Sequence, residues 1–152
     1  MKRIALIMVL IIAVFAGYSQ SSKRTTAFNY HRQGKLEKAK ESIDMAAEHE
    51  KTIKDPKTWF YRGNIYLDIA NSQDSATRNL CEDPLGVAWD SYKKCLEYDE
   101  KGTYAEDVPP RIMAIGEGYY NQGVIEYNEK EYVDAAKAFA TAFEVNKSVG
   151  KI

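Results

Sequence analysis

The two histidines and two cysteines of this chain are the residues whose types suit metal binding. His31 and His49 lie on different predicted helices, and neither belongs to an H-E-x-x-H spacing. Cys81 and Cys95 are fourteen positions apart, a separation that argues against a structural zinc site. The sequence therefore predicts no metal site and no cofactor.

Motifs for nucleophilic or phosphate chemistry are missing as well. The sequence holds no G-x-S-x-G turn that would expose a nucleophilic serine, and no G-x-x-x-x-G-K-[ST] loop that would cradle phosphates. Four acidic residues gather at the end of one predicted helix and in the turn after it: Glu126, Glu129, Glu131 and Asp134. Such a cluster is usually a solvated face. We therefore expect a protein that is not an enzyme.

The N-terminal residues have the composition of an export signal. Lys2 and Arg3 precede an unbroken apolar run over residues 4–16. This run is shorter than the ~20 residues that span a bilayer, and it fits the apolar core of a signal peptide. The alternative is an uncleaved membrane anchor.

Cleavage is expected after Ser19, where a polar stretch begins, or alternatively after Ala16. Residues 1–19 then form the signal peptide, and residues 20–152 form a mature domain in the periplasm or outer cell envelope. We expect no stable membrane insertion after cleavage.

The cysteines have two possible states in such a compartment. Disulfides persist in oxidising compartments, so Cys81 and Cys95 could form one. Alternatively, Cys95 packs as a small residue on a helix face while Cys81 lies in a polar loop.

The composition indicates one globular domain without a strongly charged partner. The chain has 152 residues, of which 45% are hydrophobic and 28% are charged. Its formal net charge of −1 lacks the basic excess of nucleic-acid-binding proteins. We therefore expect no nucleic-acid partner.

The segment between residues 55 and 99 predicts two helices that pack on each other. Each begins with an Asp-Pro pair, which is a helix start signal. Each also carries small and aromatic residues at the spacing i, i+4, i+7 of one helical face: Trp59, Gly63 and Tyr66, then Ala88, Tyr92 and Cys95. A small residue beside a ring lets two helices approach closely.

These residues resemble the tetratricopeptide repeat. The pattern W-x2-R-G-x2-Y, followed by A-x3-Y, is similar to the family signature W-x2-L-G-x2-Y and A-x3-F, with Arg62 in place of leucine. Weaker copies flank it on both sides: Ala27, Tyr30, Ala39 and Ile43 before it, and Tyr119, Gly123, Ala135, Phe139 and Ala142 after it.

The resemblance implies an all-α fold in which antiparallel helix pairs stack as a short right-handed solenoid. The repeats are expected at about 20–54, 55–100 and 110–147, with a polar loop inserted at 71–83. Within them we expect one helix from Lys35 to Lys54 and another from Pro110 to about Lys130. An array needs a terminal helix over its last apolar surface, so we expect an N-terminal fragment of a longer array or, alternatively, a second chain as the cover.

By the same resemblance, one face of the first helix in each repeat lines a concave groove for a protein or peptide partner. The groove residues would be Arg24, Phe28, His31, Phe60, Asn64, Asp68, Tyr120, Tyr127 and Asn128. We expect the rings of Phe60, Tyr120 and Tyr127 to be at least partly exposed. The alternative is that they contact a following repeat.

The expected function is that of a protein-interaction scaffold of the cell envelope. It depends on the repeat pattern and on the missing catalytic motifs. One alternative is a module that binds a glycan or another small ligand by stacking on the three rings. Another is a non-catalytic domain of a larger enzyme.

Overall fold

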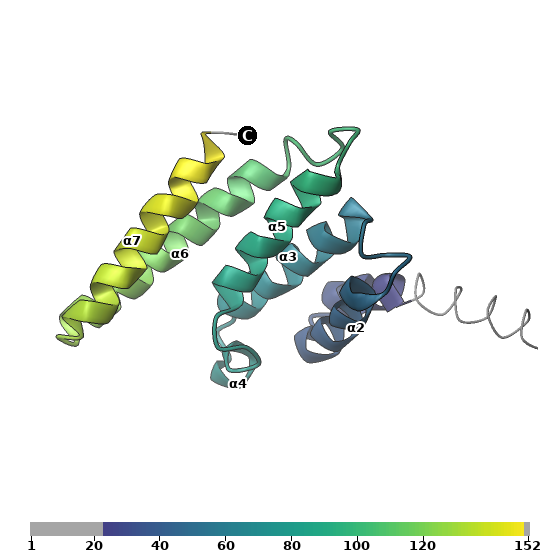
Figure 1. The fold of residues 1–152 in the computed structure, drawn as a ribbon. Coiled ribbons are helices and arrows are strands. Elements are labelled where there is room, and N and C mark those ends of the chain that lie inside the picture. The colour runs from purple at the N-terminus through teal and green to yellow at the C-terminus, as the bar shows by residue number, and fades with distance from the viewer. Residues whose placement is uncertain (1–22, 151–152) are drawn as a thin grey trace, which may run out of the picture.

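The computed structural model describes residues 23–150, and within them it is helical and contains no strand (Figure 1). The predicted all-α class is confirmed for this range. A helix covers residues 23–32 and is followed by the other elements. These are α2 (Leu36–Glu48), α3 (Pro56–Ala70), α4 (Ser75–Arg78), α5 (Pro84–Tyr98), α6 (Val108–Asn128) and α7 (Tyr132–Val149). The predicted signal peptide, residues 1–19, lies outside the described residues.

The long helices pack as antiparallel hairpins arranged one after another (Figure 1). The helix α3 packs against α5, and α6 packs against α7. On one side α2 contacts α3, and on the other α5 contacts α6. In the described part of the chain, every helix is too short or too polar to cross a membrane.

Aspartate caps and prolines set the starts of α3 and α5, as the Asp-Pro pairs predict. The Asp55 carboxylate accepts a hydrogen bond from the Lys57 backbone N–H at 2.9 Å. The Asp83 carboxylate accepts one from the Gly86 backbone N–H, also at 2.9 Å. These bonds satisfy donors that have no partner inside the helix.

The helix predicted from Lys35 to Lys54 ends earlier than expected. The helix α2 stops at Glu48 rather than Lys54, because His49 adopts an extended conformation. The Thr52 hydroxyl then donates back to the Ala46 carbonyl. The indole N–H of Trp59 donates to the Ile53 carbonyl at 2.6 Å. Contacts to two helices therefore hold residues 49–54 as a turn.

Two other boundaries also differ from the expectation. The segment 71–83 contains the one-turn helix α4, whose first N–H groups are capped by the Asp74 carboxylate. The helix α6 begins at Val108, before Pro110. Proline suits the first turn of a helix, where its missing N–H costs no hydrogen bond.

Close contacts between glycines and aromatic rings join the two helices of the α3–α5 hairpin and the two helices of the α6–α7 hairpin. A Cβ atom added to Gly63 would lie 2.5 Å from the Tyr92 ring, and one added to Gly123 would lie 2.8 Å from the Phe139 ring. Tyr92 is fully buried. The predicted packing of small residues against aromatic rings is therefore confirmed.

Arg62 joins three helices. Its Nε donates to Asp44 Oδ1 of α2 at 3.0 Å, and its terminal nitrogen donates to Ser91 Oγ of α5 at 3.0 Å. The Tyr66 hydroxyl donates to the other Asp44 oxygen at 2.8 Å. Burial, and then the bond to the Asp44 carboxylate, raises the pKa of the Tyr66 hydroxyl.

The two cysteines are free thiols, so the predicted alternative of a disulfide is wrong in this structure. Cys95 lies in α5 and is fully buried, whereas Cys81 follows α4 and is half-buried. Burial raises the pKa of the Cys95 thiol to about 12, because the apolar surroundings disfavour the thiolate.

Candidate protein-binding site

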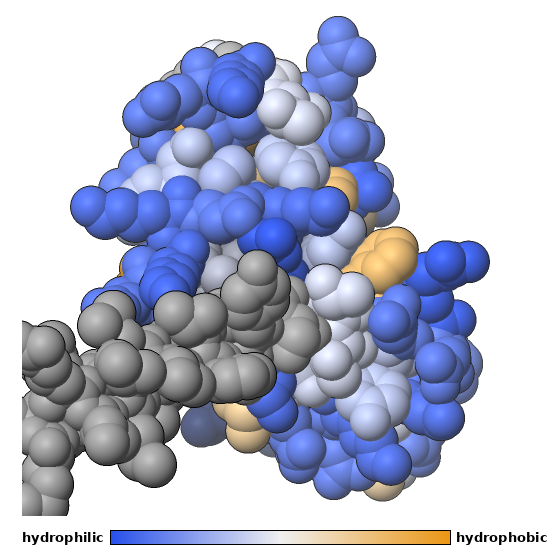
Figure 2. Space-filling view, turned by 90° about the vertical axis from the view of Figure 1, so that its right-hand side faces the viewer, coloured by the Kyte–Doolittle hydropathy of each residue, from blue (hydrophilic) through white to orange (hydrophobic). Residues whose placement is uncertain are grey.

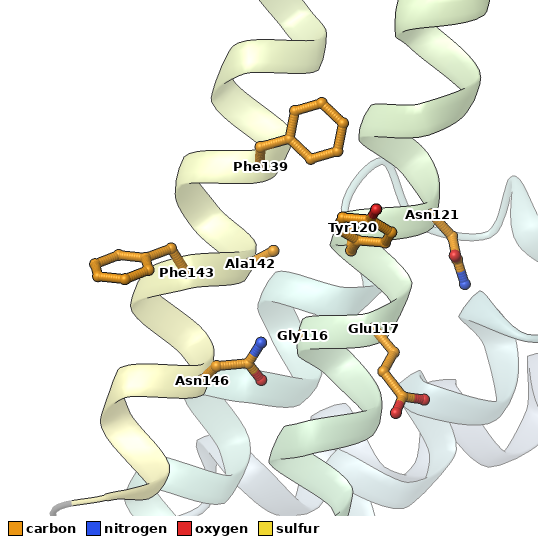
Figure 3. Close-up of a pocket in the computed structure, with 8 residues that line it drawn as sticks. All are labelled: Gly116, Glu117, Tyr120, Asn121, Phe139, Ala142, Phe143 and Asn146. Carbon is orange, nitrogen blue, oxygen red and sulfur yellow. The ribbon is translucent and has the colours of Figure 1, made fainter.

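A cavity of about 810 Å³ opens on one side of the α6–α7 hairpin (Figure 3). Both helices line it. Its eight residues are Gly116, Glu117, Tyr120 and Asn121 of α6, and Phe139, Ala142, Phe143 and Asn146 of α7. Their spacing of three and four positions places each set on one helical face.

Aromatic rings from both helices form the apolar part of this cavity. The Tyr120 and Phe139 ring centroids are 5.5 Å apart, and Phe139 points toward α6 (Figure 3). Phe143 points away from α6, at the margin of the cavity (Figure 3). Tyr120 is 57% exposed and Phe143 is 65% exposed. Large apolar surface therefore faces solvent here.

The apolar surface extends along both helices beyond the cavity. On α6 it follows the spacing i, i+7, i+11 and i+14, and on α7 it follows i, i+7 and i+11. The rings of Tyr127 and Tyr132 connect its two sides, with centroids 5.4 Å apart. We call this surface the α6–α7 apolar face; it consists of Met113, Tyr120, Val124, Tyr127, Tyr132, Phe139 and Phe143.

The opposite end of the molecule has a different surface. Where described residues are visible at the α2 end, the surface is mostly hydrophilic and its apolar side chains are isolated (Figure 2). Isolated exposed apolar residues are normal, whereas a contiguous patch indicates a binding surface. On the α6–α7 apolar face the exposed side chains are not isolated, because two ring pairs join those of α6 to those of α7.

Charge is sparse in the cavity. Glu117 is the single charged residue among its eight lining residues, and the amides of Asn121 and Asn146 are the other polar side chains apart from the Tyr120 hydroxyl. Just outside, the Lys147 ammonium lies 5.8 Å from the Phe143 ring centroid. The cavity therefore combines rings with one carboxylate.

The three predicted groove residues of the first described helix all contact α3 or its capping residue. The Phe28 ring stacks on Tyr61 with centroids 4.9 Å apart. His31 Nε2 lies 2.6 Å from Asp68 Oδ2. Arg24 forms an ion pair with Asp55, the residue that caps α3. These side chains join neighbouring helices.

Phe60 is in the core, so the expectation that its ring is exposed is wrong. It is 9% exposed. The Tyr104 ring stacks on it with centroids 4.5 Å apart, and the Arg111 guanidinium lies 4.9 Å from its centroid. Asn64 accepts hydrogen bonds from the Tyr92 hydroxyl at 2.7 Å and from Arg111 Nε at 2.9 Å. The connection between α5 and α6 folds over Phe60 and covers it.

Tyr120 and Tyr127 are exposed as predicted, and Asn128 is exposed at the end of α6. Sequence reasoning missed Met113, Tyr132 and Phe143 of the same face. A signal for them was present, because Phe143 follows Phe139 by one helical turn and Met113 precedes Tyr120 by two.

A second, more polar cavity of about 1180 Å³ lies between α4, the start of α5 and the α6–α7 hairpin. The predicted acidic cluster contributes to its lining, together with Arg78 and Lys137. Here the Tyr119 hydroxyl lies 2.9 Å and 3.0 Å from the two Asp83 carboxylate oxygens and donates to them. Among the described residues, no group of three or more His, Cys, Asp or Glu is arranged to hold a metal ion.

Searches against protein-family models, curated proteins and solved structures found no match.

Proposed function

We propose that this chain is a protein-interaction scaffold that binds a partner through the α6–α7 apolar face. One observation carries the proposal: large, well-exposed apolar side chains share one side of a single hairpin, and two ring pairs there join α6 to α7. Monomeric proteins rarely expose such a surface without a use for it. Tyrosine, phenylalanine and methionine are also enriched in protein interfaces.

The proposal includes a repeat architecture of the tetratricopeptide kind and an address in the cell envelope. The contacts Gly63–Tyr92 and Gly123–Phe139, which fall at matching positions of successive hairpins, support the first part. The basic pair and apolar run at residues 2–16 support the second. We place the partner at the exposed rings of the last hairpin rather than along the whole predicted groove.

Photo-crosslinking at position 120 tests the proposal. Tyr120 is replaced by p-benzoylphenylalanine in cells that make the protein, and mass spectrometry identifies the adduct. Ile125 is the matched control position, because it is 58% exposed but lines the other cavity. We expect a discrete protein adduct from position 120 that is absent from position 125. No adduct, or the same adduct from both positions, would contradict the proposal.

Binding of a small ligand is the second candidate. The amides of Asn121 and Asn146 beside the Tyr120 ring favour it, because ligand sites combine rings with a few placed polar groups. A volume of about 810 Å³ is also in the range of such sites. This candidate would be favoured if the wild type bound a glycan on an array, if Tyr120→Ala abolished that binding, and if no protein adduct formed at position 120.

A further inference from the structure

The α3–α5 and α6–α7 hairpins each contain a pair of aromatic rings at corresponding positions of their two helices. Phe60 precedes Gly63 by three residues, and Tyr120 precedes Gly123 by three. Each glycine touches a ring of the second helix, Tyr92 or Phe139. The two ring pairs correspond, with centroids 6.3 Å apart for Phe60–Tyr92 and 5.5 Å apart for Tyr120–Phe139.

This correspondence extends over the whole cavity of about 810 Å³. Residues of α6 match those of α3 sixty positions earlier, and residues of α7 match those of α5 forty-seven positions earlier. In the order of the cavity's lining residues, the counterparts are Pro56, Lys57, Phe60, Tyr61, Tyr92, Cys95, Leu96 and Asp99.

In the α3–α5 hairpin, the connection to the next helix and the first turn of that helix contact two of these counterparts, Phe60 and Asp99. The Tyr104 ring stacks on Phe60, the Arg111 guanidinium lies over the same ring, and the Tyr104 N–H donates to the Asp99 carboxylate at 2.6 Å. Phe60 is 9% exposed as a result, while Tyr120 is 57% exposed. The cover consists of the Tyr104 ring and backbone N–H, which precede α6, and of the Arg111 guanidinium in the first turn of α6.

The segment that leads into α3 contacts the preceding helix in a similar way. Arg24 precedes Ala27 by three residues and is therefore the counterpart of Phe60 in the first described helix. Arg24 forms an ion pair with Asp55, the residue that caps α3. At both junctions, this position contacts the segment that begins a following helix.

The cavity of the α6–α7 hairpin differs in charge from the corresponding surface of the α3–α5 hairpin, so we expect it to bind a segment of different charge. Glu117 stands where the α3–α5 hairpin has Lys57. The chain's own connection carries Glu100, Glu106 and Asp107 against the single base Lys101, and this acidic excess suits a lysine better than a glutamate. This connection is also already packed on Phe60.

We propose that the cavity accepts the start of a basic helix from a separate partner protein. An aromatic ring just before that helix stacks on Tyr120. An arginine in its first turns places its guanidinium over the Tyr120 ring, within reach of Glu117. The Asn146 side-chain oxygen accepts a backbone N–H, as Asp99 does. This inference rests on the proposed function and names the partner's chemistry.

A peptide with the sequence of residues 100–118, carrying the changes Glu100→Lys, Glu106→Lys and Asp107→Lys, is a suitable probe. It keeps the stacking ring and the arginine of the known cover, and it has the basic charge of the proposed partner. It is titrated into the ¹⁵N-labelled full chain. We expect saturable shifts of the Gly116, Tyr120 and Asn146 amides, and loss of binding with Tyr120→Ala. The variant Ile125→Ala is the control, which binds as the wild type does, and circular dichroism verifies that both variants fold.

A charge exchange tests the role of Glu117. A second peptide carries the change Arg111→Glu. The wild-type chain should bind it about tenfold more weakly than the first peptide. The variant Glu117→Lys should bind the two peptides with the opposite preference. A preference that does not depend on residue 117 would overturn the proposed arginine.

The other outcomes are distinct. Absence of peptide binding, shifts confined to α3 and α5, or binding that survives Tyr120→Ala would overturn the inference. Dimerisation of the wild type that Tyr120→Ala abolishes would show that a second copy is the occupant, and would overturn it too. An adduct at position 120 with no peptide binding would leave the proposed function standing and reject only this partner chemistry.

Discussion

The backbone of Gly63 and the ring of Tyr92 are in direct contact at the centre of the α3–α5 hairpin. A Cβ atom at position 63 would lie 2.5 Å from the ring. The ring has no room to retreat, because Tyr92 is fully buried and its hydroxyl is bonded to Asn64.

Gly63→Ala should therefore lower the free energy of unfolding, by about 1–3 kcal/mol, as overpacked cores usually do. The control is Gly150→Ala, where the nearest atom would lie 3.8 Å from the added Cβ. Urea denaturation followed by circular dichroism measures both variants. Equal stability of the two would show that Tyr92 does not fix the distance between these helices.

Corresponding ring deletions in the two hairpins should have unequal effects. Phe60→Ala should cost about 3–5 kcal/mol of stability, because it removes a buried ring from beneath Tyr104 and Arg111. Tyr120→Ala should change stability by about 0.5 kcal/mol or less, because its ring faces solvent. Thermal unfolding of both variants measures the difference. A large loss with Tyr120→Ala would mean that this ring is already covered in solution.

The ion pair between Arg62 and Asp44 should contribute measurable coupling. Both side chains are mostly shielded from solvent, and the pair links α2 to α3. A double-mutant cycle with Arg62→Gln and Asp44→Asn should give a coupling free energy of about 1 kcal/mol. The same cycle on the exposed pair Lys137 and Asp134 is the control and should give none that is measurable. Similar coupling in both cycles would show that burial does not strengthen the first pair.

Stability should fall as the pH rises above about 9. Folding raises the pKa of Cys95 from 9.0 to about 12 and the pKa of Tyr104 from 10.0 to about 12, in both cases chiefly through burial. The unfolded chain therefore loses these protons first, so each group's contribution is complete below its unfolded pKa and disappears as the pH passes the folded value. Urea denaturation between pH 7.5 and 10.5 measures the decline.

The variant Cys95→Ala isolates the contribution of the thiol. Between about pH 9 and 10 the thiol titrates in the unfolded chain before the tyrosines do, so its removal should flatten this part of the curve. A slope that is the same with and without Cys95 would contradict the predicted shift of its pKa.

The sequence predicted the parts of the fold that depend on neighbouring residues. Asp55 and Asp83 cap helices within three positions of themselves, and the Gly63 and Tyr92 stripes follow from helical spacing. Such local signals are visible in any window of the chain. The end of α2 was not predictable in this way, because contacts with Thr52 and Trp59 decide it.

The candidate site was predictable only in part for a related reason. Helical spacing shows which residues share a face, but not which segment lies over that face. Phe60 and Tyr120 have equivalent positions in sequence, yet the connection before α6 covers the first and leaves the second open. Only the path of that connection in space distinguishes them.

The carboxylate of Asp83 makes two contacts that couple local opening in different helices. It caps α5 through the Gly86 N–H, and it accepts a hydrogen bond from the Tyr119 hydroxyl in the middle of α6. Fraying of the α5 start therefore releases an anchor of the last hairpin, and undocking of that hairpin weakens the cap. Amide hydrogen exchange at Gly86 consequently reports on motions of α6 and α7, although the α6–α7 apolar face lies elsewhere on that hairpin.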